Sequence, residues 1–257
     1  MHLVIVFDLD KTIGYFEQLG IIVDLIEKNI KKSIKLNEFY ILLDLFPNYF
    51  RNNMIKVFKF LKKKKETMKI KVIIYTNNIG PKSWVFNIKN YIENKIQGKL
   101  FDKIIPAWKV NNIFYEKKRT SHNKRYDDLL RCGKLKKKDK ILFFDDYIHH
   151  HLKHKNVTYI HNKPYIKHYT IDNIIQKLYN SPFKKILNEV YKEQFKNDYK
   201  LYDYNSDENG SKKMKYNFMK EIKKFLMKNK FKISKKKYKR KIKKNKTKKN
   251  NNKNKRK

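Results

Sequence analysis

Cysteine is nearly absent from this sequence of 257 residues. Its one cysteine, Cys132, has no partner for a disulfide within the chain. This composition predicts a protein of a reducing compartment, inside the cell in the cytoplasm or the nucleus. The surrounding stretch LLRCGKL matches no motif of a catalytic thiol, so we expect Cys132 to be a buried helical residue.

Glycine and long apolar runs are also scarce. The six glycines are scattered, and neither Gly-x-Gly-x-x-Gly nor Gly-Lys-Ser/Thr occurs, which argues against nucleotide binding by a P-loop. The longest apolar runs, such as FYILL, are too short to span a bilayer, so we expect no transmembrane segment. The N-terminal MHLVIVFDLD is apolar only as far as Phe7 and lacks the charged lead-in and the cleavage site of a signal peptide.

Acidic residues are few beside basic ones. The 24 Asp and Glu residues face 65 Lys and Arg residues, which gives a formal net charge of +41. Such an excess is typical of proteins that meet polyanions, such as nucleic acid, an acidic protein or an anionic membrane surface. The abundance of Lys, Asn, Ile, Tyr and Phe is also typical of an AT-rich genome, such as that of a large DNA virus or a protist. Both explanations stay open for the globular part, and for the C-terminal tail we favour a functional one.

Five short apolar runs are continuous and do not alternate with polar residues, which predicts parallel strands covered on both faces. These runs lie at 3–7, 71–75, 103–107, 141–144 and 157–160. Apolar stripes at helical spacing lie between them, at 54–61, 84–92 and 126–130. Asn37 is a candidate N-cap for a further helix over 38–46, which Pro47 ends. The alternation predicts an α/β fold, a doubly wound, Rossmann-like parallel sheet of about five strands with helices on both faces.

The composition divides the chain into three expected segments. Residues 1–178 form the sheet domain. Residues 179–204 form an accessory helix with Ser181 as its cap and Pro182 at its first position. Residues 205–257 form a basic tail rich in Lys and Asn, an amphipathic helix followed by disordered chain.

The basic tail is a candidate binding element of its own. Residues 212–257 hold 24 Lys or Arg and a single acid, Glu221. We expect such a tail to bind nucleic acid or an acidic partner without reading sequence, through release of counterions. Its amphipathic helix is also suited to anionic lipid or to docking on a partner, and the same run fits a nuclear-localisation signal.

Polar residues follow three of the predicted strands. Asp8 and Asp10 follow the first strand in FDLDKT, Thr76 and Asn77 follow the second in YTNN, and FFDDY ends the fourth with two more aspartates. Ligands bind outside the carboxyl ends of strands in an open parallel sheet, so these groups meet if the three strands are neighbours.

Four carboxylates at one sheet edge, those of Asp8, Asp10, Asp145 and Asp146, would repel one another. A divalent cation removes this conflict, and a set of oxygen ligands favours Mg²⁺ over zinc. The sequence therefore predicts a magnesium site. His149 to His151 and His154 follow the last aspartates, and a zinc cluster there is the less favoured alternative.

The order of these motifs resembles the haloacid-dehalogenase (HAD) superfamily of phosphatases over roughly residues 1–170. The resemblance implies that Asp8 is a nucleophile that forms an aspartyl-phosphate, and that Asp10 is the general acid and then the base. It implies that Thr76, Asn77 and a lysine bind the phosphoryl group. The metal would be held by the Asp8 carboxylate, the Asp10 backbone carbonyl and Asp145, with Asp146 in support.

The phosphate-binding lysine has several candidates in the stretch YEKKRTSHNKRYDDLLRCG. In the phosphatases that the chain resembles, this lysine opens a helix one turn before leucines that face the core. Lys124 fits that register best and Lys118 is the alternative, with Lys117 and Arg125 also in the stretch.

The second and last motifs look most like the branch that contains RNA-polymerase carboxy-terminal-domain phosphatases, NLI-interacting-factor-like proteins and magnesium-dependent phosphatases. Two features depart from that branch: Asn78 stands where a hydroxyl is usual, and Asp127 and Asp128 follow the lysine at a greater distance. The segments between motifs are too short for a large cap, so we expect an open site with a small cap or none. An open site suits a phosphate on a protein or a polynucleotide better than a small metabolite. Our leading hypothesis is a phosphatase that acts on phosphoserine or phosphothreonine in a protein substrate. The alternatives are a polynucleotide end-phosphatase and a nucleic-acid-binding protein on an inactive HAD fold.

Overall fold

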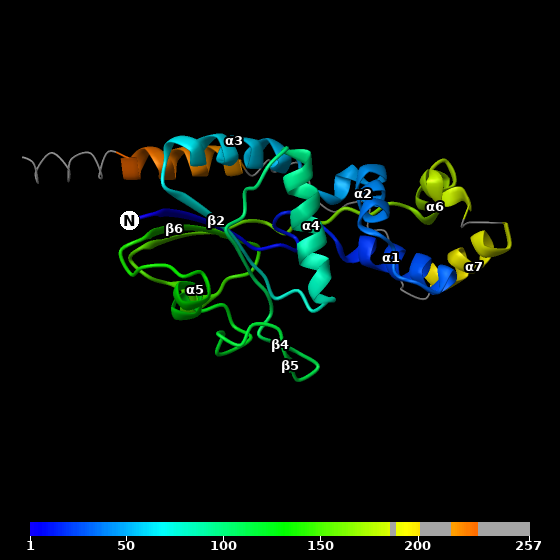
Figure 1. Cartoon of the computed structure of the whole chain (residues 1–257), viewed down its shortest axis with the longest axis horizontal. Coiled ribbons are helices and arrows are strands. Elements are labelled where there is room, and N and C mark those ends of the chain that lie inside the picture. Colours follow the sequence, from blue (N-terminus) through cyan, green and yellow to red (C-terminus); the bar gives the residue numbers. More distant parts are fainter. Residues whose placement is uncertain (186–188, 201–216, 231–257) are drawn as a thin grey trace, which may run out of the picture. The chain divides into compact units, whose positions relative to one another are not determined.

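A parallel sheet of five strands lies at the centre of the fold (Figure 1). A computed structural model describes residues 1–185, 189–200 and 217–230. The strands of this sheet are β1 (Leu3–Phe7), β2 (Ile70–Tyr75), β3 (Lys103–Ile105), β6 (Lys140–Asp145) and β7 (Val157–His161). Their spatial order is β3-β2-β1-β6-β7, and all four pairings are parallel. The predicted α/β fold with a parallel sheet of about five strands is confirmed.

Helices alternate with the strands along the chain. The helices are α1 (Glu17–Ile30), α2 (Leu36–Leu45), η1 (Pro47–Tyr49), α3 (Met54–Thr67), α4 (Lys82–Lys95), α5 (Tyr126–Cys132), η2 (His150–Leu152), α6 (Ile171–Tyr179), η3 (Pro182–Lys185) and α7 (Glu189–Lys200). The chain divides into two compact units, Met1–Tyr216 and Asn217–Lys257, and a further helix over 218–230 lies in the second. None of the helices in the described part of the chain is long and apolar enough to cross a membrane.

Both faces of the sheet are covered, which explains why its strands are continuous apolar runs. All five residues of β1 are buried. Val4 and Val6 share a core cluster with Leu129 and Cys132 of α5. Phe7 points to the other face, where its ring meets the ring of Phe58 on α3 at 5.6 Å between centroids. Figure 1 accordingly shows α3 and α5 on opposite sides of the sheet. Cys132 is a buried helical residue, as predicted.

Two local features differ from the sequence-based expectations. The helix predicted from Asn37 begins one residue earlier, at Leu36, with Lys35 at its N-cap position. Glu38 accepts a hydrogen bond of 2.6 Å from the backbone N–H of Lys35, so the Asn37 cap was wrong. The connection from β1 to β2 also holds three α-helices, and the first of them, α1, was missed, because the sequence analysis placed helices there only over 38–46 and 54–61.

A small hairpin was missed by the sequence analysis. Strands β4 (Lys109–Val110) and β5 (Ile113–Phe114) pair antiparallel after β3. Asn111 and Asn112 form the turn with φ values of 48° and 62°. Two successive residues with positive φ are the mark of a type I′ turn, for which asparagine is well suited. The stretch VNNI therefore carried the signal, although its strands are only two residues long.

Helix α7, in the expected accessory segment, packs against α1 of the sheet domain within the same unit. Gln18 of α1 is fully buried, and its amide donates to the backbone carbonyl of Tyr169 at 2.9 Å and to the hydroxyl of Tyr199 on α7. Tyr49 donates to the Gln18 carbonyl oxygen at 2.7 Å. The helix predicted to start at Pro182 is a 3₁₀ turn there, and α7 begins at Glu189. The Lys/Asn-rich end of the predicted tail, from 231 onward, lies outside the described residues.

Candidate acidic site at the strand ends

The carboxyl ends of three neighbouring strands carry the candidate site. Strand β1 lies between β2 and β6, the arrangement that the sequence analysis required for the motifs to meet. Phe7 is in register with Ile74 on β2 and with Phe144 on β6. Asp8 therefore follows β1 at the level of Asp145, and its backbone N–H donates to the Phe144 carbonyl at 2.9 Å.

Three carboxylates form a compact group. Asp8, Asp145 and Asp146 each offer an oxygen atom, and these atoms lie within 4.8 Å of one another. Asp8 and Asp145 are buried, and Asp146 is half-buried. The carboxylate of Asp10 has a different partner, because its Oδ2 accepts a hydrogen bond of 2.8 Å from the amide of Asn78. Three carboxylate oxygens at one point are a suitable partial ligand set for a hard cation such as Mg²⁺.

A buried lysine holds two of these carboxylates. Lys124 Nζ donates to Asp8 Oδ1 at 2.5 Å and to Asp145 Oδ2 at 2.7 Å, and Lys124 is only 2% exposed. Lys124 directly precedes Arg125, the N-cap residue of α5. Lys118, the alternative, is exposed. Of the lysines considered from the sequence, the structure therefore brings Lys124 to the acidic group.

One ammonium group cannot balance four carboxylates. Burial raises the pKa of Asp8, and the Asp145 carboxylate adds to this rise, while Lys124 opposes both. Burial raises the pKa of Asp10 to about 6, although the hydrogen bond from Asn78 favours the ionised form. Burial and the neighbouring Asp145 also raise the pKa of Asp146. The site is thus short of positive charge, which a bound divalent cation would supply.

Thr76 and Asn77 differ in their surroundings. Thr76 is buried, and its hydroxyl oxygen accepts a hydrogen bond of 2.9 Å from the backbone N–H of Asn78. The hydroxyl proton of Thr76 can therefore be donated to an anion. Asn77 is exposed, and its side-chain oxygen accepts a hydrogen bond of 2.7 Å from Arg119.

Arg119 was not singled out by the sequence analysis, although it is 2% exposed. Its guanidinium donates to the backbone carbonyls of Thr76 at 3.1 Å, Pro106 at 2.7 Å and His122 at 2.9 Å. It therefore ties together the loop after β2, the end of β3 and the segment that leads to Lys124. One arginine among many basic residues carries no local signal of such a role.

The sequence analysis also missed two residues that hold the first motif in place. Thr12 donates to Asp146 Oδ1 at 3.2 Å. Arg51 Nε donates to the Thr12 carbonyl at 2.8 Å, and its Nη2 donates to the Lys11 carbonyl at 2.6 Å. Thr12, the threonine of FDLDKT, thus orients Asp146. This contact joins residues 134 positions apart, beyond the reach of a local pattern.

The histidine run does not form a shared metal site within the described residues. His149 lies beside the acidic group, with Nε2 at 3.6 Å from Asp145 Oδ2. Burial, aided by the charge of Lys124, lowers the pKa of His149 to about 4, so this ring is neutral at pH 7. His150 and His151 are exposed, and His154 stacks on the ring of Tyr126. The group of Asp8, Asp145 and Asp146 is the one metal-ligand cluster in the described part of the chain.

Comparison with known proteins assigns no family. No protein-family model, curated protein or solved structure matches this chain. The argument for function therefore depends on the geometry and chemistry of the strand ends.

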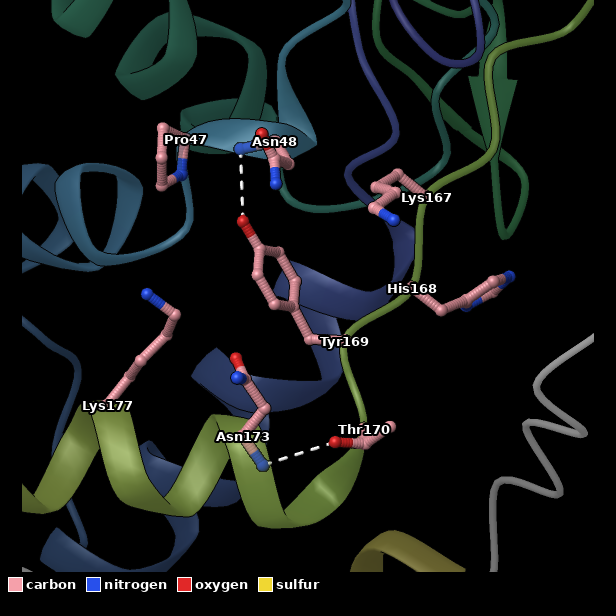
Figure 2. Close-up of a pocket in the computed structure, with 8 residues that line it drawn as sticks. All are labelled: Pro47, Asn48, Lys167, His168, Tyr169, Thr170, Asn173 and Lys177. Carbon is pink, nitrogen blue, oxygen red and sulfur yellow. Dashed lines mark hydrogen bonds between the residues drawn. The ribbon is translucent and has the colours of Figure 1, made fainter. Parts of the chain in front are cut away.

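A separate pocket of about 340 Å³ lies near the start of α6 (Figure 2). Its lining residues are Pro47, Asn48, Lys167, His168, Tyr169, Thr170, Asn173 and Lys177. Figure 2 shows the hydroxyl of Tyr169 accepting a hydrogen bond of 3.1 Å from the backbone N–H of Asn48. The pocket includes none of the carboxylates at the strand ends, so we place the candidate chemistry at those ends.

Proposed function

We propose that this protein is a Mg²⁺-dependent phosphatase of the HAD type that acts through an aspartyl-phosphate on phosphoserine or phosphothreonine in proteins. The observation that carries the proposal is the joint position of Asp8, Asp145 and Asp146 around one point, with Lys124 bonded to two of them. A nucleophilic carboxylate next to a fixed ammonium group is suited to attack on a phosphoryl group, whose negative charge must be neutralised.

The proposed reaction has two steps. Asp8 attacks phosphorus and forms an acyl-phosphate bond, while the bond from phosphorus to the substrate oxygen breaks and Asp10 gives that oxygen a proton. Asp10 then takes a proton from the water that hydrolyses the acyl-phosphate, which releases phosphate and restores Asp8. Thr76 and Lys124 would bind the phosphoryl oxygens.

Magnesium would be held by Asp8, the backbone carbonyl of Asp10 and Asp145, with Asp146 in support, as the resemblance implies. When bound, the ion would supply positive charge that stabilises the phosphoryl oxygens. Asp10 is a suitable proton carrier for two reasons: its carboxylate is bonded to Asn78 and its pKa is raised to about 6.

The two proposed substrate classes can be separated with purified protein. The charge of +41 favours the second candidate, a polynucleotide end-phosphatase. Release of phosphate from a phosphoserine peptide and from a 3′-phosphorylated oligonucleotide should be measured under the same conditions. We expect the peptide to be the better substrate, and a strong preference for the oligonucleotide would favour the second candidate.

Removal of metal should abolish activity. We expect turnover of an aryl phosphate in Mg²⁺, its loss in EDTA and its return when Mg²⁺ is added. Mg²⁺ should also raise the melting temperature, because a ligand that binds only the folded state stabilises it. Asp145→Asn should lose this thermal shift, whereas Asp172→Asn, at an exposed position in α6, should keep it. Turnover that persists in EDTA, with no thermal shift in Mg²⁺, would contradict the metal site.

The hydrogen bond from Asn78 makes a prediction about pH. Asp10 must be protonated to act as the acid, so activity should fall as pH rises through its pKa, about 6. Asn78→Ala removes a donor that stabilises the ionised carboxylate. The pKa of Asp10 should then increase, and the basic limb of kcat/KM should move upward by about one pH unit. Asn94→Ala serves as the control, since Asn94 is exposed in α4 and is not among the predicted site residues. A basic limb that stays in place in Asn78→Ala would remove Asp10 from this role.

A further inference from the structure

An exposed apolar and basic surface is linked to the acidic site through Asn78, whose side-chain amide donates to Asp10. We call it the hairpin surface, and it consists of Ile79, Lys82, Lys109, Ile113 and Phe114. Ile79 is 74% exposed, Ile113 is 64% exposed and Phe114 is 42% exposed. Isolated exposed apolar residues are common, but several beside one site indicate a place where a partner binds.

The segment that follows β2 connects the hairpin surface to the site. Ile79 follows Asn78, which bonds to Asp10, and precedes Lys82 at the start of α4. Lys82 Nζ donates to the Phe114 carbonyl at 3.4 Å, which joins α4 to β5.

A second connection leads from the base of the hairpin to Lys124. The ring of Trp108 meets the ring of His122 at 5.1 Å between centroids, and His122 lies two residues before Lys124. Arg119 fixes the same region through Pro106 and His122. A chain whose phosphorylated residue enters the acidic site therefore has the hairpin surface next to it.

The charge of this region selects an acidic occupant. Residues 103–125 hold seven Lys or Arg and one acid, Glu116, and five of these seven basic residues are not buried. Lys82 is exposed at the first turn of α4, where the helix dipole also favours negative charge. An acidic partner is thus attracted, while the exposed isoleucines and Phe114 offer contacts to apolar side chains.

The same surface is less suited to nucleic-acid bases. Bases stack on free aromatic faces, but Lys109 Nζ lies over the rings of Trp108 at 4.7 Å and Phe114 at 4.3 Å from the centroids. Lys82 Nζ lies over the ring of Tyr115 at 4.9 Å. The two most exposed apolar residues of the surface, Ile79 and Ile113, are aliphatic and give no stacking platform.

We propose that the hairpin surface binds the polypeptide segment next to the phosphorylated residue of a protein substrate, and that this segment carries both acidic and apolar side chains. The proposal rests on the proposed phosphatase function. It specifies which part of the substrate is recognised beyond the phosphorylated residue, and it assigns that recognition to the hairpin surface.

The test compares a phosphopeptide, which is long enough to contact the hairpin surface, with a small aryl phosphate, which is not. The double variant Ile113→Ser/Phe114→Ser should raise KM about tenfold for a phosphoserine peptide flanked by Asp, Glu and Leu, a loss typical of apolar anchors at an interface. Its kcat for that peptide, and its turnover of an aryl phosphate that is too small to reach the hairpin, should match the parent. Leu36→Ser is the matched control, because Leu36 is 42% exposed at the start of α2. A phosphopeptide flanked by Lys and Ser should show no change.

A second variant keeps the test decisive if the double variant does not fold. Lys82→Glu changes an exposed residue at a helix N-terminus, where glutamate is well tolerated. It should raise KM for the acidic phosphopeptide and leave the turnover of the aryl phosphate unchanged. Unchanged KM in both folded variants would overturn the proposal, and so would a larger loss for a phosphorylated oligonucleotide than for the peptide.

Failure of the proposed function gives a different pattern. In that case the parent would hydrolyse neither aryl phosphate nor phosphopeptide in Mg²⁺. Binding of the fluorescently labelled acidic peptide, followed by anisotropy, still tests the surface without turnover. Loss of this binding in the hairpin variants would support the surface alone, and equal binding by parent and variants would overturn it.

Discussion

Asp8→Asn should lower the turnover of an aryl phosphate by about a thousandfold or more, the scale expected when a covalent nucleophile is removed. An amide cannot form the acyl-phosphate bond, although its carbonyl oxygen can still accept the hydrogen bond that Lys124 gives to Asp8. Asp127→Asn is the control, because Asp127 is exposed in the first turn of α5. Retained turnover in Asp8→Asn would remove Asp8 as the nucleophile.

The same variant has an expected effect on stability. Burial raises the pKa of Asp8 above its usual value, so the folded state binds this proton more tightly than the unfolded state. The resulting contribution to stability is present at low pH and is lost as pH rises through the raised pKa. Asparagine carries no such proton. In EDTA, the melting temperature of Asp8→Asn relative to the parent should therefore increase between pH 5 and pH 9. A relative decrease would contradict the shifted pKa.

Lys124→Ala should lose both activity and stability. The substitution leaves Asp8 and Asp145 buried without their shared ammonium group. Removal of one partner from a buried ion pair typically costs about 3–5 kcal/mol in the free energy of unfolding. We expect a loss of this order in denaturant titrations without metal. Mg²⁺ should restore part of it, because the cation replaces the missing positive charge.

Lys118→Ala is the matched control for Lys124→Ala. Lys118 lies six residues earlier and is exposed, so its loss should change stability by little. Its effect on aryl-phosphate turnover should also be small. Lys124→Met is a useful companion variant, since it keeps most of the side-chain volume and separates loss of charge from loss of packing. Equal stability of the Lys124 and Lys118 variants, or the reverse order of activity, would mean that Lys124 is not the phosphate-binding lysine.

Much of the architecture could be predicted from the sequence because strands and helices leave local patterns of apolar residues. A strand buried on both faces must be apolar at every position, and β1, β2 and β6 are such runs. The stripes of α3, α4 and α5 repeat at the helical period for a similar reason. The hairpin β4–β5 was missed since two-residue strands have almost no period, and only the pair Asn111–Asn112 marks its turn.

The sequence by itself placed acidic residues after the ends of two predicted strands and a threonine after a third. It did not determine that β1 lies between β2 and β6, which brings those ends together. The helix register favoured Lys124 over Lys118, but it did not reveal that Lys124 bonds to Asp8 and Asp145, nor the hydrogen bonds of Asn78 and Arg119. These outcomes depend on contacts between residues far apart in the chain. Burial against distant elements, and the charges met there, decide which side chains share one space, and no short stretch of sequence contains that information.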